Sequence, residues 1–409
     1  MKRPETHTPV LFFRIQYAQG GVQTTYVRVA NHLAEEGRPP HVFSLLRRGP
    51  LLAHFHPQVP VQTGLLGVFR PRFFRTLRAV DAVFIPDCYC LCIVAIFSPV
   101  LRLLNVKVLL AVYHPREYHF HGVLRRCYRT LVGSLPRSQV LFMNSVTRDT
   151  VSADLGLSFA DSPIVPVPAL ASVPPATRGG RAGRKHRKIV SIGRLVDFKL
   201  YPYAVIDTLQ ELKKSGHGDF SYHIYGDGPL RDSLAEYIAR STVSDRVFLH
   251  GEMPYAQFGE VVADAFAFVG MGMSMVEAAC RGVPSLIAIE SVREPVSYGF
   301  FGRTAATYEF CIGECKPDEP TVTFAALLTR LDEISEEEYA AIVVAGQEES
   351  KKFSLSYFSE RLDAFSGKTE AIAAPGKFWL AGLLAPLLLA FYCCVPRLRT
   401  QFKTRYARI

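Results

Sequence analysis

The sequence lacks several features that would assign the protein to a class at once. It has nine cysteines, but no Cys-x-x-Cys pair is matched by a second Cys or His pair, so we expect no zinc site. The N-terminus has no uninterrupted apolar run, because Arg14 and Gln16 break it, so we expect no signal peptide. An odd cysteine count without a signal peptide predicts a cytoplasmic protein in a reducing compartment.

Acidic residues are also scarce relative to basic ones. There are 37 Asp and Glu against 47 Lys and Arg, which gives a net charge of +10. Such a surface suits nucleic acid, an anionic membrane or phosphorylated ligands. The basic clusters carry few interleaved aromatic residues of the kind that stack on single-stranded bases, so we expect no nucleic-acid partner. A membrane surface is the better match.

The length of 409 residues exceeds what one hydrophobic core usually holds, and two domains are expected. In the first half, apolar strands alternate with helices, which favours a doubly wound parallel α/β sheet. The predicted strands are 10–15, 41–46, 82–86, 106–112 and 140–144, and the predicted helices include 22–36 and a nearly all-apolar one at 88–104.

A Pro-, Gly- and Arg-rich stretch then interrupts the pattern, and the alternation of strands and helices restarts at Lys188. We therefore predict two Rossmann-like parallel-sheet domains facing across a cleft. The predicted boundaries are 1–172 for the first domain, 173–187 for a basic linker, 188–349 for the second domain, 350–376 for a C-terminal helix and connector, and 377–409 for a hydrophobic segment with a basic tail.

The hydrophobic segment has two interpretations. Residues 378–395 carry no charge, and their number is close to the roughly 20 needed to cross a bilayer. Basic residues follow it, from Arg397 to Arg408, as expected of an anchor at an anionic membrane face. The alternative is a buried C-terminal helix of the globular fold.

Three blocks in the second half indicate chemistry. They are Ile-Val-Ser-Ile-Gly-Arg-Leu at 189–195, His-Ile-Tyr-Gly-Asp-Gly-Pro-Leu at 223–230, and Val-Glu-Ala-Ala-Cys-Arg-Gly-Val-Pro-Ser at 276–285. Each is interpreted as a strand that runs through a turn into a helix. Such units present backbone N–H groups and cations to an anion, and here they would suit a nucleoside diphosphate.

These blocks resemble the nucleotide-sugar-dependent glycosyltransferases of the GT-B fold, in the group called family 4. The resemblance covers roughly residues 10–365. It implies retaining transfer from a nucleoside diphosphate sugar, UDP- or GDP-linked, without a metal or other cofactor. The family pattern Gly-Arg-Leu-x-x-x-Lys-Gly matches Gly193, Arg194 and Lys199, with Leu200 in place of the second glycine. In the family this Arg and Lys hold the diphosphate, and fixed cations stabilise charge on a departing diphosphate.

Glu277 matches the second glutamate of the family's Glu-x7-Glu motif, which binds the ribose. The chain departs from the motif at the first glutamate, because Val269 stands there. The turn between them would bring backbone N–H groups to the phosphates or the sugar. Its donor-binding candidates are Gly270, Gly272, Met273 and Ser274.

Further candidates lie elsewhere in the chain. Gly20 and Gly21 match the family's glycine-rich loop, and His114 matches a histidine that lies beside the transferred sugar. His119 and His121 follow closely, but with no Asp-x-Asp in the chain we expect no metal. Gly226 belongs to a Gly-x-Gly-Pro-Leu turn that shapes the nucleotide pocket. Met253 lies where the family contacts the base.

The favoured hypothesis is a hexosyltransferase of polysaccharide biosynthesis. Its partners would be a nucleotide-sugar donor, a glycan or polyprenyl-linked acceptor, and the inner face of the cell membrane. Two alternatives stay open. One is a sugar-nucleotide epimerase of the same fold, for which no second carboxylate beside Glu277 is found. The other is a catalytically degenerate subunit that binds a partner transferase, which Val269 motivates.

Overall fold

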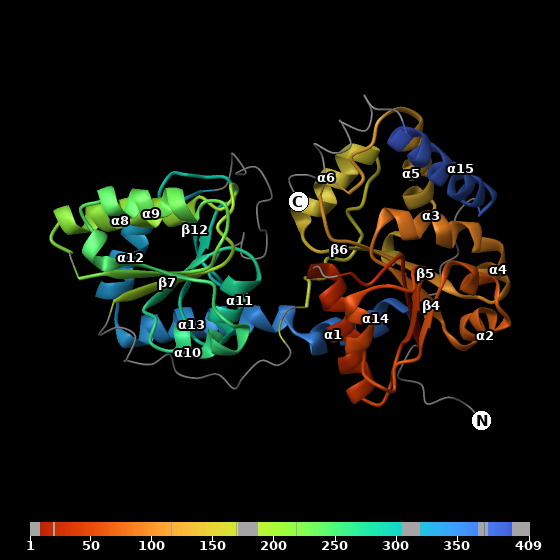
Figure 1. The fold of residues 1–409 in the computed structure, drawn as a ribbon, viewed down its shortest axis with the longest axis horizontal. Coiled ribbons are helices and arrows are strands. Elements are labelled where there is room, and N and C mark those ends of the chain that lie inside the picture. The colour runs from red at the N-terminus through yellow and green to blue at the C-terminus, as the bar shows by residue number, and fades with distance from the viewer. Residues whose placement is uncertain are drawn as a thin grey trace. The chain divides into compact units, whose positions relative to one another are not determined.

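The computed structural model describes residues 9–18, 21–115, 117–168, 170, 187–217, 219–304, 320–366, 372 and 375–394. The chain forms two compact units, each with its own parallel-dominated sheet (Figure 1). Unit 1 combines residues 1–168 with 355–409, and unit 2 comprises residues 169–354. The chain therefore returns to the first unit after it completes the second.

Unit 1 contains a six-stranded parallel sheet in the order β3-β2-β1-β4-β5-β6. Its strands are β1 (Val10–Arg14), β2 (His41–Ser44), β3 (Val61–Thr63), β4 (Ala82–Ile85), β5 (Lys107–Val112) and β6 (Val140–Phe142). Every residue of β1 is buried, and successive side chains enter opposite cores: Phe12 lies in one cluster and Phe13 in the other. Both faces are thus covered, which explains why these strands are apolar throughout.

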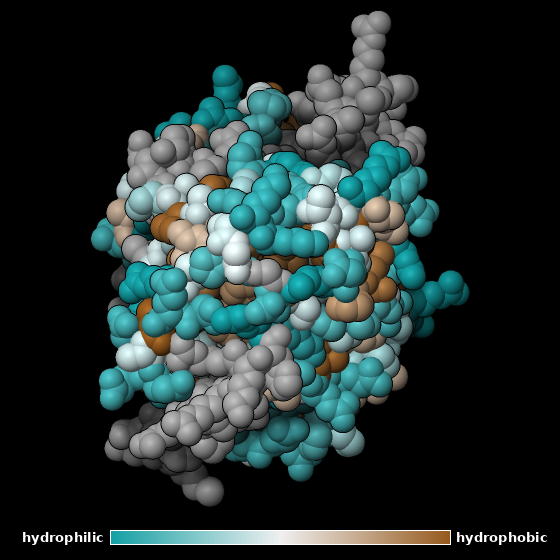
Figure 2. All heavy atoms as spheres, turned by 90° about the vertical axis from the view of Figure 1, so that its left-hand side faces the viewer, coloured by the Kyte–Doolittle hydropathy of each residue, from teal (hydrophilic) through white to brown (hydrophobic). Residues whose placement is uncertain are grey.

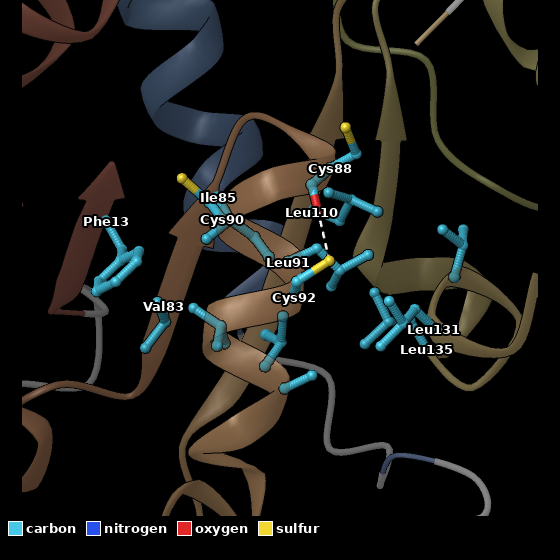
Figure 3. Packing of buried hydrophobic residues seen from close by; sticks show 14 of the residues in the cluster. Phe13, Val83, Ile85, Cys88, Cys90, Leu91, Cys92, Leu110, Leu131 and Leu135 are labelled. Atoms are coloured by element: carbon cyan, nitrogen blue, oxygen red, sulfur yellow. Dashed lines mark hydrogen bonds between the residues drawn. The ribbon is translucent and has the colours of Figure 1, made fainter. Parts of the chain in front are cut away.

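The helices of unit 1 cover these two faces. They are α1 (Gly21–Glu35), α2 (Pro71–Ala79), α3 (Cys88–Ile96), α4 (Ser98–Leu103), α5 (Gly122–Gly133), α6 (Ser145–Leu155), α14 (Leu355–Ser366) and α15 (Pro375–Cys394), with short 3₁₀ turns η1 (Pro50–His54), η2 (Leu65–Phe69) and η3 (Arg137–Gln139). Cys88, Cys90 and Cys92 of α3 pack as small apolar side chains against the sheet, and the Cys92 thiol donates to the Cys88 carbonyl at 3.3 Å (Figure 3).

The C-terminal hydrophobic segment forms α15, which packs on α3 and α5 (Figure 1). Phe378, Ala381 and Ala385 are buried in the same cluster as the cysteines of α3. A side chain at Gly382 would collide with Ala95, so the two helices approach closely there. Among the described helices, none is long and apolar enough to cross a membrane. Of the two interpretations of residues 378–395, the packing of α15 on α3 and α5 matches the buried C-terminal helix.

Unit 2 contains a seven-stranded sheet in the order β13-β12-β11-β10-β7-β8-β9. The strands β7 (Lys188–Ile192), β8 (Ser221–Tyr225), β9 (Val247–Gly251), β10 (Ala267–Gly270) and β11 (Ser285–Ala288) are parallel, and β12 (Val296–Phe300) and β13 (Val322–Thr323) add antiparallel pairs at one edge. The antiparallel pair is absent from the sequence-based prediction, since β12 follows a turn with no apolar helix to mark a crossover.

The helices of unit 2 are α8 (Tyr201–Lys214), α9 (Arg231–Arg240), α10 (Phe258–Val262), α11 (Met273–Cys280), α12 (Phe324–Glu333) and α13 (Glu336–Ser350), with 3₁₀ turns η4 (Ser244–Arg246), η5 (Tyr255–Gln257) and η6 (Lys351–Phe353). They enclose two apolar clusters, one on each side of the sheet. The face of unit 2 shown in Figure 2 is mostly hydrophilic, and its apolar patches are small and separate.

Two local predictions need correction. The apolar helix expected over 88–104 is two helices: α3 ends at Ile96, and α4 begins at Ser98, so that Pro99 lies in a first turn, where its missing N–H costs no hydrogen bond. The block at 276–285 runs from helix α11 into strand β11, in the reverse order to that expected. Both errors arise where apolar composition alone does not give direction or continuity.

Candidate functional site

The topology of unit 2 marks a position for a ligand. The chain places β8 and β9 on one side of β7 and then crosses to β10 on the other side. Ligands of open α/β sheets bind outside the carboxyl ends of the strands at such a switch point. The loop 193–200 leaves β7 at this edge, and the turn before α11 leaves β10 beside it. The sequence-predicted donor residues Arg194, Lys199 and Gly270–Ser274 therefore share one edge of one sheet.

Glycines shape the loop after β7. Gly193 N–H donates to the Tyr225 carbonyl at 2.9 Å, and Leu195 N–H donates to the Asp227 carbonyl at 2.9 Å. A Cβ at Gly226, which has φ 148°, would lie 1.9 Å from the Gly193 carbonyl oxygen. The Gly-x-Gly-Pro-Leu turn thus supports the loop that carries Arg194. The Asp227 side chain bonds within its own turn, to Gly228 N–H and Arg231.

The two cations of this loop differ in environment. Arg194 is exposed, whereas Lys199 is partly buried. The pKa of Lys199 is lowered from its ordinary value, first by burial and then by the neighbouring charge of Arg194, while Glu290 acts in the opposite direction. Glu290 follows β11 at the same edge. The carboxylate of Glu290 is one that the sequence analysis did not single out, because no motif marks it.

The N-terminus of α11 forms the other side of the switch point. Gly272 is its N-cap, with φ 71°, and no atom lies within 4 Å of where a Cβ would stand. Met273 and Ser274 open the first turn and are partly exposed. The first N–H groups of a helix have no intrahelical acceptor and carry partial positive charge, so they suit an anion.

Glu277 lies one turn further into α11 and is held by two side chains. It is 8 % exposed. The Tyr255 hydroxyl lies 3.0 and 2.9 Å from its two oxygens, and Arg281 Nη2 donates to Oε1 at 3.1 Å. A carboxylate can accept about four hydrogen bonds, so acceptor capacity is left for ligand hydroxyls. Tyr255 and Arg281 are site residues that the sequence analysis missed, although the i,i+4 spacing of Glu277 and Arg281 was visible.

The position of Val269 in the sheet explains why the chain departs from the glutamate motif. Only Met271 and Gly272 separate β10 from α11, so position 269 falls inside the strand. The Val269 side chain is fully buried in the core, and its carbonyl accepts from Ser191. A glutamate at this position would be buried in an apolar cluster, which is costly. In this chain position 269 lies inside a strand, so it offers no loop from which a carboxylate could reach the sugar.

The remaining predicted site residues fall as follows. Gly21 is the first residue of α1, and His114 follows β5, both in unit 1. Gly20 lies outside the described residues. Met253 is partly buried against the core of unit 2. His119 pairs with Asp154 at 2.7 Å. Within the described part of the chain, no group of three or more His, Cys, Asp or Glu residues could hold a metal ion.

Comparison with solved structures decides the fold. HepE from Anabaena in complex with UDP aligns with 87% of this chain and 98% of its own, at a TM-score of 0.58 and 15% identity. TarM from S. aureus, in a complex that contains UDP, aligns with 88% of this chain and 100% of its own, at a TM-score of 0.53 and 10% identity. The lipopolysaccharide outer core galactosyltransferase WaaB aligns with 86% of this chain and 99% of its own, at a TM-score of 0.50 and 16% identity. The fold is GT-B.

The comparison of sequences adds a finding on unit 2 of this GT-B chain. Residues 178–296 match the family model of glycosyl transferases group 1. The matched segment contains Arg194, Lys199 and Glu277, and with them both sides of the switch point described above. No curated protein matches the chain significantly.

Proposed function

We propose that this protein transfers a hexose from a nucleoside diphosphate sugar to a glycan or a polyprenyl-linked acceptor in polysaccharide biosynthesis. The reaction would proceed with retention and without a metal, as the resemblance to family 4 implies. Donor binding would use Arg194, Lys199, Gly226, Met253, Glu277 and the turn from Gly270 to Ser274. On the side of unit 1 it would use Gly20, Gly21 and His114.

One observation carries the proposal: a single sheet edge presents groups for both halves of a nucleoside diphosphate. Arg194, Lys199 and the first N–H groups of α11 supply positive charge for the diphosphate. Glu277, oriented by Tyr255 and Arg281, supplies a hydrogen-bond acceptor for ribose hydroxyls. The HepE structures with UDP and UDP-glucose support the same ligand class.

The chemistry follows from this placement. Cleavage of the sugar–phosphate bond leaves negative charge on the diphosphate, and the cations and helix N-terminus would stabilise that charge as it develops. Since these groups are held by the β7 and β10 edges before the ligand arrives, little reorganisation is needed. His114, at the end of β5, would position the transferred hexose.

Thermal stabilisation by nucleotides tests the donor assignment. Wild-type protein is melted with UDP, GDP, ADP and no ligand. We expect UDP or GDP to raise the Tm, because a ligand that binds only the folded state stabilises it by mass action. If all three nucleotides leave the Tm unchanged, the transferase proposal loses its basis. Hydrolysis and transfer assays with UDP- and GDP-linked hexoses then separate a transferase from the epimerase and degenerate-subunit alternatives.

We also propose that the enzyme works in the cytoplasm at the inner face of the membrane, where a lipid-linked acceptor lies. Support comes from unit 1, where Leu65, Leu66 and Phe69 of η2 are 66–70% exposed and lead directly into α2. On α2, Arg72, Arg75 and Arg78 are exposed. Exposed apolar groups beside arginines fit an anionic lipid interface.

Vesicle sedimentation tests the membrane proposal. Vesicles with phosphatidylglycerol should pellet the wild type, and the double variant Leu66→Ser/Phe69→Ser should bind several-fold more weakly. Val344→Ser, an exposed apolar residue of α13 in unit 2, serves as the matched control. Equal binding by all three proteins would contradict a role for η2.

A further inference from the structure

The sheet of unit 1 has a switch point of its own. The chain places β2 and β3 on one side of β1 and crosses to β4 on the other side. Arg14 is the last residue of β1, and Asp87 lies two residues after the end of β4. By the same rule that locates the site in unit 2, a ligand of unit 1 would bind outside the carboxyl ends of these two strands.

Arg14 is unusual in its surroundings there. Its side chain is 8% exposed, and its Nη2 atom lies 3.7 Å from Asp87 Oδ2. The guanidinium stacks over the Tyr26 ring at 5.3 Å. Its Nε and Nη1 atoms are buried, and no described residue accepts a hydrogen bond from them. A buried charged donor without an acceptor is costly, so such a group in a native structure needs an explanation. A function at this position, such as the recognition of a ligand, is one explanation that the switch point suggests.

Two carboxyl groups complete the cluster. Asp87 caps α3, where Oδ1 accepts from Cys90 N–H at 2.8 Å. Glu117 comes from the loop after β5, and its carboxyl group accepts from Cys88 N–H at 2.8 Å. Burial, and then the charge of Asp87, raise the pKa of Glu117 well above its ordinary value, against the opposing backbone hydrogen bonds. His114 lies three residues before Glu117 and bonds to it through the backbone.

The combination of charges selects the ligand class. Arg14 is balanced by Asp87, so a free anion would meet a carboxylate beside the guanidinium and be repelled. A neutral polyol avoids this cost, because each hydroxyl both donates and accepts. It can accept from Arg14 and donate to a carboxylate at the same time.

We propose that Arg14, Asp87 and Glu117 form a binding site in unit 1 for neighbouring hydroxyl groups of a neutral sugar, the acceptor of the transfer reaction. This inference deepens the proposed function and rests on it for the word acceptor. The recognition of a neutral sugar by unit 1 is independent of donor binding by unit 2.

The test uses variants that keep the local structure. Asp87→Asn retains a good N-cap for α3 while removing the charge and turning a donor toward Arg14. Glu117→Gln retains an oxygen for Cys88 N–H. Arg14→Gln removes the guanidinium. Asp149→Asn, an exposed carboxylate of α6 in the same unit, is the matched control. Melting temperatures report whether each variant is folded.

Saturation-transfer NMR on the full chain gives the readout. The probes are the methyl α-glycosides of glucose, galactose and mannose, with inorganic phosphate as the anionic probe and UDP as the reporter of unit 2. We expect the wild type and Asp149→Asn to bind at least one glycoside. Asp87→Asn and Arg14→Gln should bind it about tenfold more weakly, with UDP binding unchanged.

Each other outcome overturns a specific claim. Glycoside binding that survives in all three cluster variants, or no glycoside binding by a wild type that binds UDP, refutes the sugar site alone. Phosphate binding that is lost in Arg14→Gln would show an anion site instead. Absence of UDP binding, with glycoside binding intact, would refute a uridine nucleotide as the donor and leave the sugar site standing.

Discussion

The two sheets have the same strand order about their switch points, but different chemical groups lie at those two points. In unit 2 the edge is built from glycine backbone, two cations and a helix N-terminus. In unit 1 the corresponding edge is built from side chains, with the buried Arg14 near the partly buried Asp87 and Glu117. Backbone N–H groups and lone cations suit phosphate, whereas paired charges suit neutral hydroxyls. One topology thus offers two positions, and we expect the residues at the carboxyl ends of β1, β4, β7 and β10 to decide what each position binds.

Removing a cation from the switch point of unit 2 should have the largest effect on the transfer rate, and it tests whether that edge differs from the edge of unit 1 as described. Lys199→Ala is expected to reduce transfer by about a hundredfold to a thousandfold, since stabilisation of developing charge is often the largest single contribution to catalysis. The control is Arg240→Ala, which removes a mostly exposed cation of α9 that pairs with Glu236. Initial rates with saturating donor give the measurement, and near-wild-type turnover by Lys199→Ala would overturn the assignment.

Adding a methyl group to the supporting turn should be the next largest effect. Gly226→Ala places a Cβ against the Gly193 carbonyl, at a φ that L-residues avoid. We expect a loss of about 3 kcal/mol in the free energy of unfolding, together with weaker donor binding. Gly37→Ala is the control, because Gly37 has φ 77° but open space around it. It should lose only about 1–2 kcal/mol. Urea titrations would show equal losses if the contact with Gly193 were unimportant.

Changes at the ribose side of unit 2 should have a smaller effect. Glu277→Gln is expected to raise the donor KM about tenfold, since it weakens hydrogen bonds to a charged acceptor. Tyr255→Phe removes only the hydroxyl that bridges the two oxygens, and should raise KM a few-fold. The ratio of the two effects is the informative quantity. A larger effect of Tyr255→Phe would mean that Tyr255 itself, rather than Glu277, meets the donor.

Acid should act on the two units in opposite directions. Burial, with Lys188 and His250 nearby, lowers the pKa of His223 to about 4 from 6.5. The unfolded chain then binds more protons, so the stability that neutral His223 contributes to unit 2 is lost as pH falls from 6.5 to 4. Glu117 has a raised pKa, so its contribution to unit 1 is present at low pH and is lost as pH rises above 4.5.

Paired variants measure these two contributions separately. As pH falls below 6.5, the unfolding free energy of the wild type should decrease relative to that of His223→Gln, because Gln does not titrate. The difference between wild type and Glu117→Gln should move in favour of the variant as pH rises above 4.5. Parallel pH profiles of wild type and variants would contradict the environments described for these two side chains.

The sequence predicted a large part of the fold and one side of the candidate site. Strand and helix alternation gave the doubly wound α/β class, because buried parallel strands leave an apolar signal that is hard to mistake. The comparison of structures confirmed the GT-B fold. Composition alone failed at Pro99, where it predicted one helix instead of two, and it left two interpretations open for the segment 378–395. There an apolar helix packs on α3 and α5, and the same composition would also suit a membrane.

The site divides in the same way. Arg194, Lys199 and Glu277 could be named from the sequence because they stand in local motifs whose spacing is tied to one turn or one helix. Glu290, Tyr255 and the Arg14 cluster carry no such pattern, since each meets its partner only through strand pairing or a distant loop. Val269 illustrates both sources of information. The sequence showed that the motif's first glutamate is missing, and the structure showed that this position is buried inside a strand.

By itself, then, the sequence determined the fold class and the cations and carboxylate that suit a nucleoside diphosphate, because periodicity and turn chemistry are local properties. Tertiary structure decided that the last helix joins unit 1, that position 269 is buried in a strand, and that Arg14 faces Asp87. These depend on which strands become neighbours and which faces they bury, and no short segment contains that information.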